Sequence, residues 1–324
     1  MTLIVRELAE DEHPLWDDLV ARSPQRTIFA QRWWVDVVTE GGARFLGCFD
    51  KERLVGGLPI WPLSTLGVKR LRQPPLTPYW GPLLDSPDGR ETVPSTEINV
   101  LTALSEALAA WPDSVLQFHH SLQNWLPFYW NGYRQTTRYT YRIADLGDLQ
   151  SLRRSLHETA RRKLARGERD GLSTEDMVDP GLVARLAKSS MDRQGASSSS
   201  ALPRLWAALA QESGARGCIF TNAAVDDQGH ARAATAIVWD DRCAYNILVG
   251  SDARFMDRSS GTMTTWRAIE HASSVVPEFD FEGSMVRGVS GFYRTFGGAL
   301  TPYLHVTRRS SLRLNAARML RGGP

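Results

Sequence analysis

The spacing of apolar residues in the first part of the chain predicts an alternation of strands and helices. Strands are expected over residues 3–8, 44–49, 54–63, 115–119 and 137–143, with apolar and polar residues alternating in the first of them. Apolar residues recur at helical spacing, as on one face of a helix, over residues 14–21, 30–39, 101–111 and 122–130. This order predicts a mixed α/β domain.

A turn and a basic helix mark the expected end of that domain. The turn is formed by Asp145, Leu146, Gly147 and Asp148, and a long arginine-rich helix follows it. The scheme then recurs, with helices expected at 180–192, 202–213 and 263–273 and strands at 218–225, 231–239 and 244–250. We therefore predict an α/β (α+β) fold of two tandem domains, residues 1–146 and 147–324, each a mixed sheet flanked by helices.

Two carboxylates stand in the last predicted strand, residues 279–285. Asp280 and Glu282 alternate with Phe279 and Phe281, so both acids are expected on one face and both rings toward the core. A pair of acids at a strand's carboxyl end can accept a proton, bind an ammonium group, or serve as structural hydrogen-bond acceptors. The residues alone leave these three roles open.

A short helix is expected after this strand. Phe292 and Phe296 are four residues apart and share its apolar face, so Tyr293 and Arg294 point elsewhere. Gly297 begins a glycine pair that ends the helix. Tyr293 is therefore expected to face a cleft.

A polar loop opens the helix expected at 263–273. Backbone N–H groups at a helix N-terminus bind anions, and glycine allows a phosphate to approach closely. The predicted donor-phosphate residues are Arg258, Ser259, Ser260, Gly261 and Thr262, together with Arg294.

The block around Tyr293 resembles the last strand and helix of the GNAT acyltransferases, and the loop at 258–262 resembles their pyrophosphate loop. One GNAT domain needs only about half of 324 residues, so the chain resembles proteins with two GNAT domains in tandem. With residues 27–34, 73–82, 161–166 and 280–298, it resembles the FemAB-like (BioF2-like) family, the aminoacyltransferases of peptidoglycan bridge formation and their relatives in small-molecule biosynthesis.

The resemblance implies direct transfer of an acyl group to an amine, giving an amide without a covalent enzyme intermediate. Glu282 or Asp280 would accept the amine's proton, and Tyr293 would hydrogen-bond to the departing hydroxyl or thiol. Arg258 and Arg294 would hold phosphate. The donor is a co-substrate, aminoacyl-tRNA or acyl-CoA, and no other cofactor is expected.

Basic residues gather on the helix after residue 150, although the net charge is only +2. A basic helix suits a polyanion such as tRNA, and it equally suits a plain solvated surface. The predicted tRNA-binding residues are Arg161, Arg162, Lys163 and Arg166. No sequence module for DNA accompanies them.

A proline-rich segment offers a candidate acceptor pocket. Prolines stiffen the loop around Thr77, Tyr79 and Trp80, and aromatic rings give shaped apolar area for a small-molecule or peptide amine. Ordinary packing explains these residues about as well.

Bulk composition agrees with an ordinary globular enzyme. Hydrophobic residues make up 42% of the chain, and no apolar run approaches the roughly 20 residues that a membrane helix needs. We therefore expect a cytoplasmic protein. No metal site is expected, because Cys48, Cys218 and Cys243 are far apart and His119 and His120 are adjacent in a strand.

Three functions from different classes follow. The first is transfer of an aminoacyl group from aminoacyl-tRNA, which the tandem layout and the basic helix favour. The second is acyl-CoA-dependent N-acyl transfer, which Tyr293 and the loop at 258–262 favour. The third is a non-catalytic binding protein of the same fold.

Overall fold

The computed structural model describes residues 3–86, 93–193, 201–255, 259–283, 285–311 and Leu314. Its contacts divide the chain into two compact units: unit 1 runs to Arg138 and takes up the chain again from Pro302, and unit 2 is Tyr139–Thr301. The expected boundary after residue 146 falls inside unit 2. In the described residues, no helix is long and apolar enough to cross a membrane.

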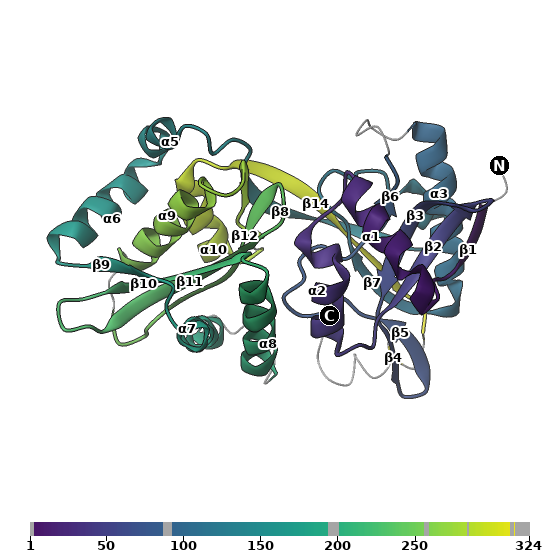
Figure 1. Cartoon of the computed structure of the whole chain (residues 1–324), viewed down its shortest axis with the longest axis horizontal. Coiled ribbons are helices and arrows are strands. Elements are labelled where there is room, and N and C mark those ends of the chain that lie inside the picture. The colour runs from purple at the N-terminus through teal and green to yellow at the C-terminus, as the bar shows by residue number, and fades with distance from the viewer. Residues whose placement is uncertain are drawn as a thin grey trace. The chain divides into compact units, whose positions relative to one another are not determined.

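Unit 1 contains an antiparallel sheet in the order β1-β2-β3-β6 (Figure 1). Further strands pair in the order β4-β5-β7-β14. Its strands are β1 (Leu3–Glu7), β2 (Arg44–Asp50), β3 (Arg53–Ile60), β4 (Pro62–Thr65), β5 (Val68–Leu71), β6 (Leu83–Leu84), β7 (Asp113–Gln117) and the later part of β14 (Ala299–Arg309). Its helices are η1 (Glu10–Glu12), α1 (His13–Arg22), η2 (Ile28–Ala30), α2 (Arg32–Thr39), α3 (Pro94–Ala107), η3 (Leu108–Ala110) and α4 (Leu126–Trp130). Trp16, Leu58 and Leu104 are among the fully buried residues of its core.

Unit 2 has the strand order β8-β13-β12-β11-β10-β9, and only β12 and β13 are parallel to each other. The strands are the later part of β8 (Arg134–Ile143), β9 (Ser173–Asp176), β10 (Ile219–Val225), β11 (Ala231–Trp239), β12 (Cys243–Ser251) and β13 (Glu278–Asp280). The helices are α5 (Leu149–Ser155), α6 (Glu158–Arg169), α7 (Pro180–Arg193), α8 (Leu202–Ala215), α9 (Ser260–Ala272), α10 (Arg287–Tyr293) and η4 (Arg294–Phe296).

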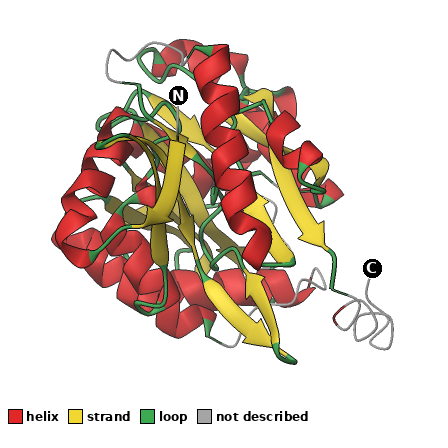
Figure 2. Cartoon of the chain, turned by 90° about the vertical axis from the view of Figure 1, so that its right-hand side faces the viewer, coloured by secondary structure: helices red, strands yellow, loops and turns green. Residues whose placement is uncertain are grey.

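Helices cover both faces of the sheet in unit 2. Figure 1 shows α6, α9 and α10 on one side and α7 and α8 on the other, and Figure 2 gives the same elements by type. A close approach of α6 to α9 depends on Gly167, since a Cβ there would lie 2.3 Å from Met263 Sδ. A side chain at position 167 would therefore require the Met263 side chain to move.

The structure confirms the predicted mixture of sheets flanked by helices, and it differs locally in three places. The basic helix is two helices, because the His157 side chain accepts a hydrogen bond from the Thr159 N–H and starts α6 anew. The strand predicted at 279–285 ends at Asp280. Strand β14 was not predicted at all.

Candidate active site

A cavity of about 360 Å³ lies in unit 2 beside the part of β12 that extends past the end of β13. β12 pairs with β13 only over Cys243–Tyr245, and β12 then continues to Ser251 without it. The cavity has the size of a pocket for a small ligand or for part of a larger one. It is lined by Lys163, Ser190, Val249, Gly250, Ser251, Ser260, Gly261, Val286, Gly288, Val289, Phe292 and Tyr293.

Tyr293 ends α10 in the wall of this cavity, as its predicted cleft-facing position requires. Its ring lies 5.1 Å from the Phe281 ring and 5.6 Å from the Phe292 ring, and the residue is 8% exposed. Burial, and then the nearby charge of Glu282, raises the pKa of Tyr293 above its usual value. The hydroxyl therefore keeps its proton at neutral pH and can donate it.

Glu282 lies in a strained turn and not in a strand. Its φ is 59° and that of Gly283 is 66°, both in the left-handed region, which costs free energy for a residue with a side chain. Glu282 Oε1 is buried and has no hydrogen-bond partner among the described residues. Burial, and then the charge of Asp280, raises the pKa of Glu282 well above its usual value, so the carboxyl holds its proton more tightly than a free glutamate.

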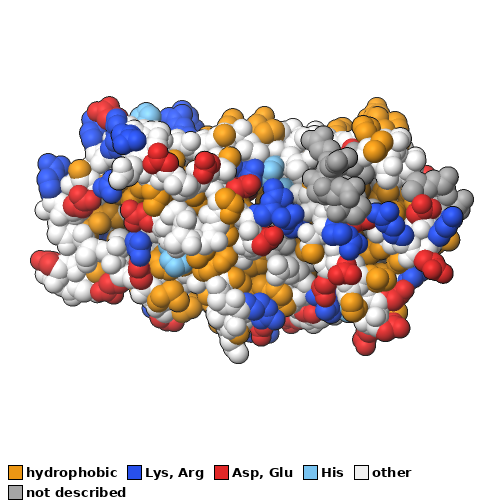
Figure 3. Space-filling model, turned by 45° about the horizontal axis from the view of Figure 1, so that its top comes forward, with side chains coloured by type: hydrophobic (Ala, Val, Ile, Leu, Met, Phe, Trp, Pro, Cys, Tyr) orange, Lys and Arg blue, Asp and Glu red, His pale blue; other side chains and the backbone are white. Residues whose placement is uncertain are grey.

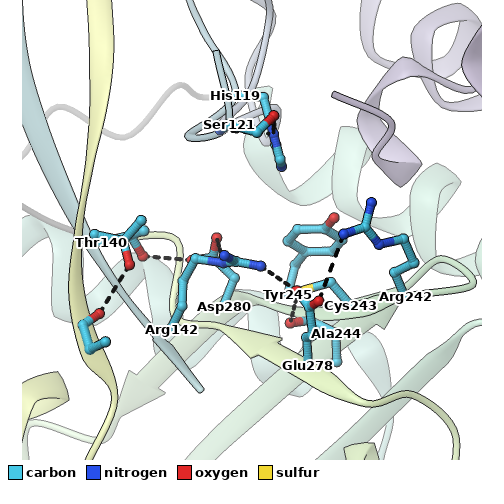
Figure 4. A network of polar contacts seen from close by, with 12 residues as sticks. His119, Ser121, Thr140, Arg142, Arg242, Cys243, Ala244, Tyr245, Glu278 and Asp280 are labelled. Atoms are coloured by element: carbon cyan, nitrogen blue, oxygen red, sulfur yellow. Dashed lines mark hydrogen bonds and ion pairs between the residues drawn. The ribbon is translucent and has the colours of Figure 1, made fainter. Parts of the chain in front are cut away.

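Asp280 occupies a different environment, so the prediction that both acids share one strand face is wrong. Figure 4 shows Thr140 and Arg142 turned toward Asp280: the Thr140 hydroxyl donates at 2.6 Å, and Arg142 Nε lies 3.6 Å from its other oxygen. The N–H of Glu282 donates to the same carboxylate at 2.8 Å. Asp280 therefore fixes the start of the turn that carries Glu282. The Arg142 guanidinium also donates a hydrogen bond to the Glu278 carboxylate.

The polar start of α9 contributes two of its predicted residues to the cavity. Ser260 and Gly261 line the wall, whereas Ser259 and Thr262 are buried and do not. Arg258 lies outside the described residues. Arg294 is exposed on η4 and is absent from the lining.

The basic helix α6 divides into an exposed set and one cavity residue. Arg161, Arg162 and Arg166 are exposed, and the last two form ion pairs with acids one helical turn away. Lys163 lines the cavity, with its ammonium 5.9 Å from the centre of the Phe292 ring. In Figure 3, Lys and Arg side chains, with acidic ones among them, gather at the left of the view, where α5 and α6 lie. The helical spacing of Ala160, Lys163, Leu164 and Gly167 could have separated Lys163 from the arginines.

The predicted acceptor residues lie in unit 1. Thr77 is buried: its hydroxyl accepts a hydrogen bond from Trp34 Nε1 at 3.2 Å and donates to the Pro75 carbonyl at 2.9 Å. Tyr79 and Trp80 line a cavity of about 10 Å³, enough for roughly one water molecule. Their role in holding an acceptor stays a prediction.

The remaining wall was not foreseen from the sequence. Two hydrogen bonds join the end of β12 to α7. The Ser251 N–H donates to Ser190 Oγ at 2.9 Å, and Arg193 donates to the Ser251 carbonyl at 2.9 Å. The apolar part comes from Val249 on β12 and Val286 and Val289 near α10. Only the position of these residues in the fold reveals their role.

Among the described residues, no group of three or more His, Cys, Asp or Glu side chains could hold a metal ion. All three cysteines are free thiols, and burial raises the pKa of Cys48 to about 12 and that of Cys243 well above its usual value. A thiol with a raised pKa is a poor nucleophile at neutral pH.

Comparisons with known proteins agree with the geometry. Residues 151–292 match the model of an acetyltransferase (GNAT) domain. The search of curated proteins found no match. Among solved structures, FemX is similar over 93% of this chain and 96% of its own, with a TM-score of 0.65 and 12% identity.

Two further structures share the architecture. A tandem GNAT protein from the clavulanic acid biosynthesis pathway matches 94% of this chain and 98% of its own, with a TM-score of 0.54 and 16% identity. The C-terminal domain of a putative lysylphosphatidylglycerol synthetase from Agrobacterium fabrum covers 95% of each chain, with a TM-score of 0.51 and 13% identity. These similarities confirm the predicted tandem GNAT fold.

Proposed function

Since this chain is an acyltransferase with a GNAT domain in a tandem GNAT fold like that of FemX, we propose that it forms amides by direct N-acyl transfer in the cavity beside α10. The observation that carries the proposal is the position of Tyr293: a protonated phenol in the wall of a cavity beside the part of β12 that extends past the end of β13. The acceptor is the amine of a small molecule or peptide.

The reaction joins the amine nitrogen to the acyl carbon and breaks the bond from that carbon to the leaving oxygen or sulfur. Tyr293 hydrogen-bonds to the leaving atom and supplies its proton, which a phenol with a raised pKa holds at neutral pH. Both reactants are bound together, so no acyl-enzyme is needed, and the cysteines, of which Cys48 and Cys243 are buried, take no part.

Glu282 is the better candidate for the amine's proton. Its Oε1 has no hydrogen-bond partner among the described residues, whereas Asp280 is engaged by Thr140, Arg142 and the Glu282 N–H. A raised pKa makes the carboxylate a stronger base once it is ionised, so Glu282 must release its own proton before it can accept one from the amine. Glu282 is absent from the cavity lining, so one proton of the acceptor's ammonium group reaches it through a water molecule, and the second replaces the proton that Tyr293 gave to the leaving atom. Asp280 acts as a positioning residue.

Aminoacyl-tRNA is the donor that we favour. A polyanion needs a basic surface next to the reacting end, and α6 carries the exposed Arg161, Arg162 and Arg166 on the same helix as the cavity residue Lys163. The FemAB-like resemblance of the sequence supports the same donor.

Acyl-CoA is the second candidate, and a specific observation favours it. Ser260 and Gly261 place the N-terminal turn of α9 at the cavity, the position where backbone N–H groups can meet a pyrophosphate.

Offering the two donors separately decides between them. The purified protein is incubated with an amine pool and either a mixture of charged tRNAs or a mixture of acyl-CoAs, and amide products are identified by mass spectrometry. Product from charged tRNA alone supports the first donor, and product from acyl-CoA alone supports the second. Tyr293→Phe is the matched control, and no product from either pool would overturn the proposal.

A further inference from the structure

The elements that line the cavity beside α10 differ in the polarity of the side chains they supply. Its polar side chains, apart from Tyr293, come from four other elements: Lys163 on α6, Ser190 on α7, Ser251 on β12 and Ser260 on α9. α10 and the residue before it supply Val286, Gly288, Val289, Phe292 and Tyr293. A ligand therefore meets an apolar surface along α10, next to the hydroxyl at the end of that helix.

Gly288 leaves a gap in this apolar surface. Its backbone is helical and not left-handed, so its conformation does not require glycine. A Cβ at this position would have no atom of the described chain within 4 Å, so close packing does not require glycine either. Alanine favours a helix more than glycine does. Neither the backbone nor the packing of the described residues therefore explains the missing side chain.

Helical spacing places this gap on the cavity side of α10. Gly288 lies one turn before Phe292, which also lines the cavity, and residues four apart share a helix face. Gly291 shares its face with Arg287 instead, and neither of these two residues lines the cavity. A Cβ at position 291 would be just as unobstructed as one at position 288. Of the two glycines in α10, only Gly288 therefore borders the ligand.

We propose that Gly288 is a specificity-determining residue of this cavity, and that the transferred acyl group carries a bulky apolar side chain, branched or aromatic, that occupies the space beside Gly288. The inference rests on the proposed function, because it takes the leaving atom to lie at the Tyr293 hydroxyl. Five residues separate Gly288 from Tyr293, which corresponds to about 7.5 Å along a helix axis. A phenylacetyl or phenylalanyl group is long enough to extend from the reacting carbon toward Gly288, and an acetyl or glycyl group is not.

Two pairs of donor probes that differ only in the acyl group test this size selection with the full chain. The first pair is phenylacetyl-CoA and acetyl-CoA. The second is adenosine with phenylalanine or glycine joined to its ribose through a stable amide, which mimics the charged end of a tRNA. Calorimetry measures the binding of all four, without an acceptor amine, to the wild type, Gly288→Ala, Gly288→Val and the matched control Gly291→Val. Alanine and valine both favour a helix more than glycine, so the fold is preserved.

Burial of an aromatic ring beside α10 should make the bulky member of at least one pair bind roughly tenfold more tightly than the small member in the wild type. Gly291→Val should keep this preference. Gly288→Val should reduce it to less than about twofold while the small member still binds, because the added side chain takes up the space of the ring. Gly288→Ala should give an intermediate preference. The pair that responds identifies the carrier of the acyl group.

Four results would overturn the inference: no size preference in the wild type, a preference that survives in Gly288→Val, an equal loss in Gly291→Val, or an equal weakening of both members of a pair in Gly288→Val. Amide formation is measured separately, with an amine pool. A size preference without any amide product would remove the proposed function and leave Gly288 as a determinant of ligand size. Amide product without a size preference would remove only the role of Gly288.

Discussion

Replacement of Glu282 by glutamine should stabilise the protein relative to the wild type, by an amount that grows as the pH rises. In the folded chain the carboxyl is buried, Oε1 has no hydrogen-bond partner among the described residues, and the pKa is raised well above 4.5, the ordinary value. In the unfolded chain the same group has its ordinary pKa. Glutamine has the same shape and accepts the same strained φ of 59°, so backbone strain cancels in the comparison.

The direction of this pH dependence follows from whether the folded or the unfolded chain binds the proton more tightly. Above pH 4.5 the unfolded chain releases this proton and the folded chain retains it, so rising pH favours the unfolded state until the folded pKa is passed. One proton changes the free energy of unfolding by about 1.4 kcal/mol per pH unit. Between pH 5 and pH 7 the wild type should therefore lose up to about 2.7 kcal/mol relative to Glu282→Gln.

Urea denaturation at pH 5, 6, 7 and 8 measures this difference. Glu175 on β9 is exposed, so Glu175→Gln serves as a matched control. Its free energy of unfolding should change with pH in the same way as that of the wild type. If the difference in the free energy of unfolding between the wild type and Glu282→Gln does not change with pH, the assignment of a raised pKa to Glu282 is refuted.

Three other predictions concern the reaction, the packing and the donor. Tyr293→Phe should lower turnover by about 10-fold to 1,000-fold with little change in melting temperature, since it removes a proton donor and keeps the ring; full activity would exclude Tyr293 from the chemistry. Gly250→Ala should destabilise by at least about 2 kcal/mol, because its Cβ would lie 2.1 Å from the backbone of α7, whereas Gly214→Ala in open space should be neutral or slightly stabilising in thermal unfolding. If the donor is tRNA, replacing Arg161 and Arg162 by alanine should reduce the slope of log affinity against log salt by about one unit per lost phosphate contact, and an unchanged slope in filter binding would place tRNA elsewhere.

Local pattern was enough to predict most elements of the fold. The strand at 231–239 and the helix beginning at 180 lie where the spacing of apolar residues places them. The end of the helix at Gly297 also agrees, because its φ of 82° needs the freedom that glycine provides. These features depend on neighbours in the sequence, which is why the sequence alone specifies them.

Features that depend on distant residues were not predicted. Alternation placed Asp280 and Glu282 on one face, but a left-handed turn at Glu282, held by contacts of Asp280 with β8, breaks that alternation. The arginines and the proline of β14 resemble a surface segment, and it becomes a strand by pairing with β7 and β8, which are distant in the sequence. Lys163 was grouped with three arginines because charge alone does not show which side of α6 faces the cavity.

The return of β14 to unit 1 has a consequence for the order of folding during synthesis. His305, Val306 and Thr307 pair with β7, yet the ribosome makes them only after all of Tyr139–Thr301. Unit 1 therefore emerges with an open edge at β7, and exposed edges of this kind invite pairing with other chains. The residues of unit 2 must be synthesised first, and the last strand then closes the unit that was begun first.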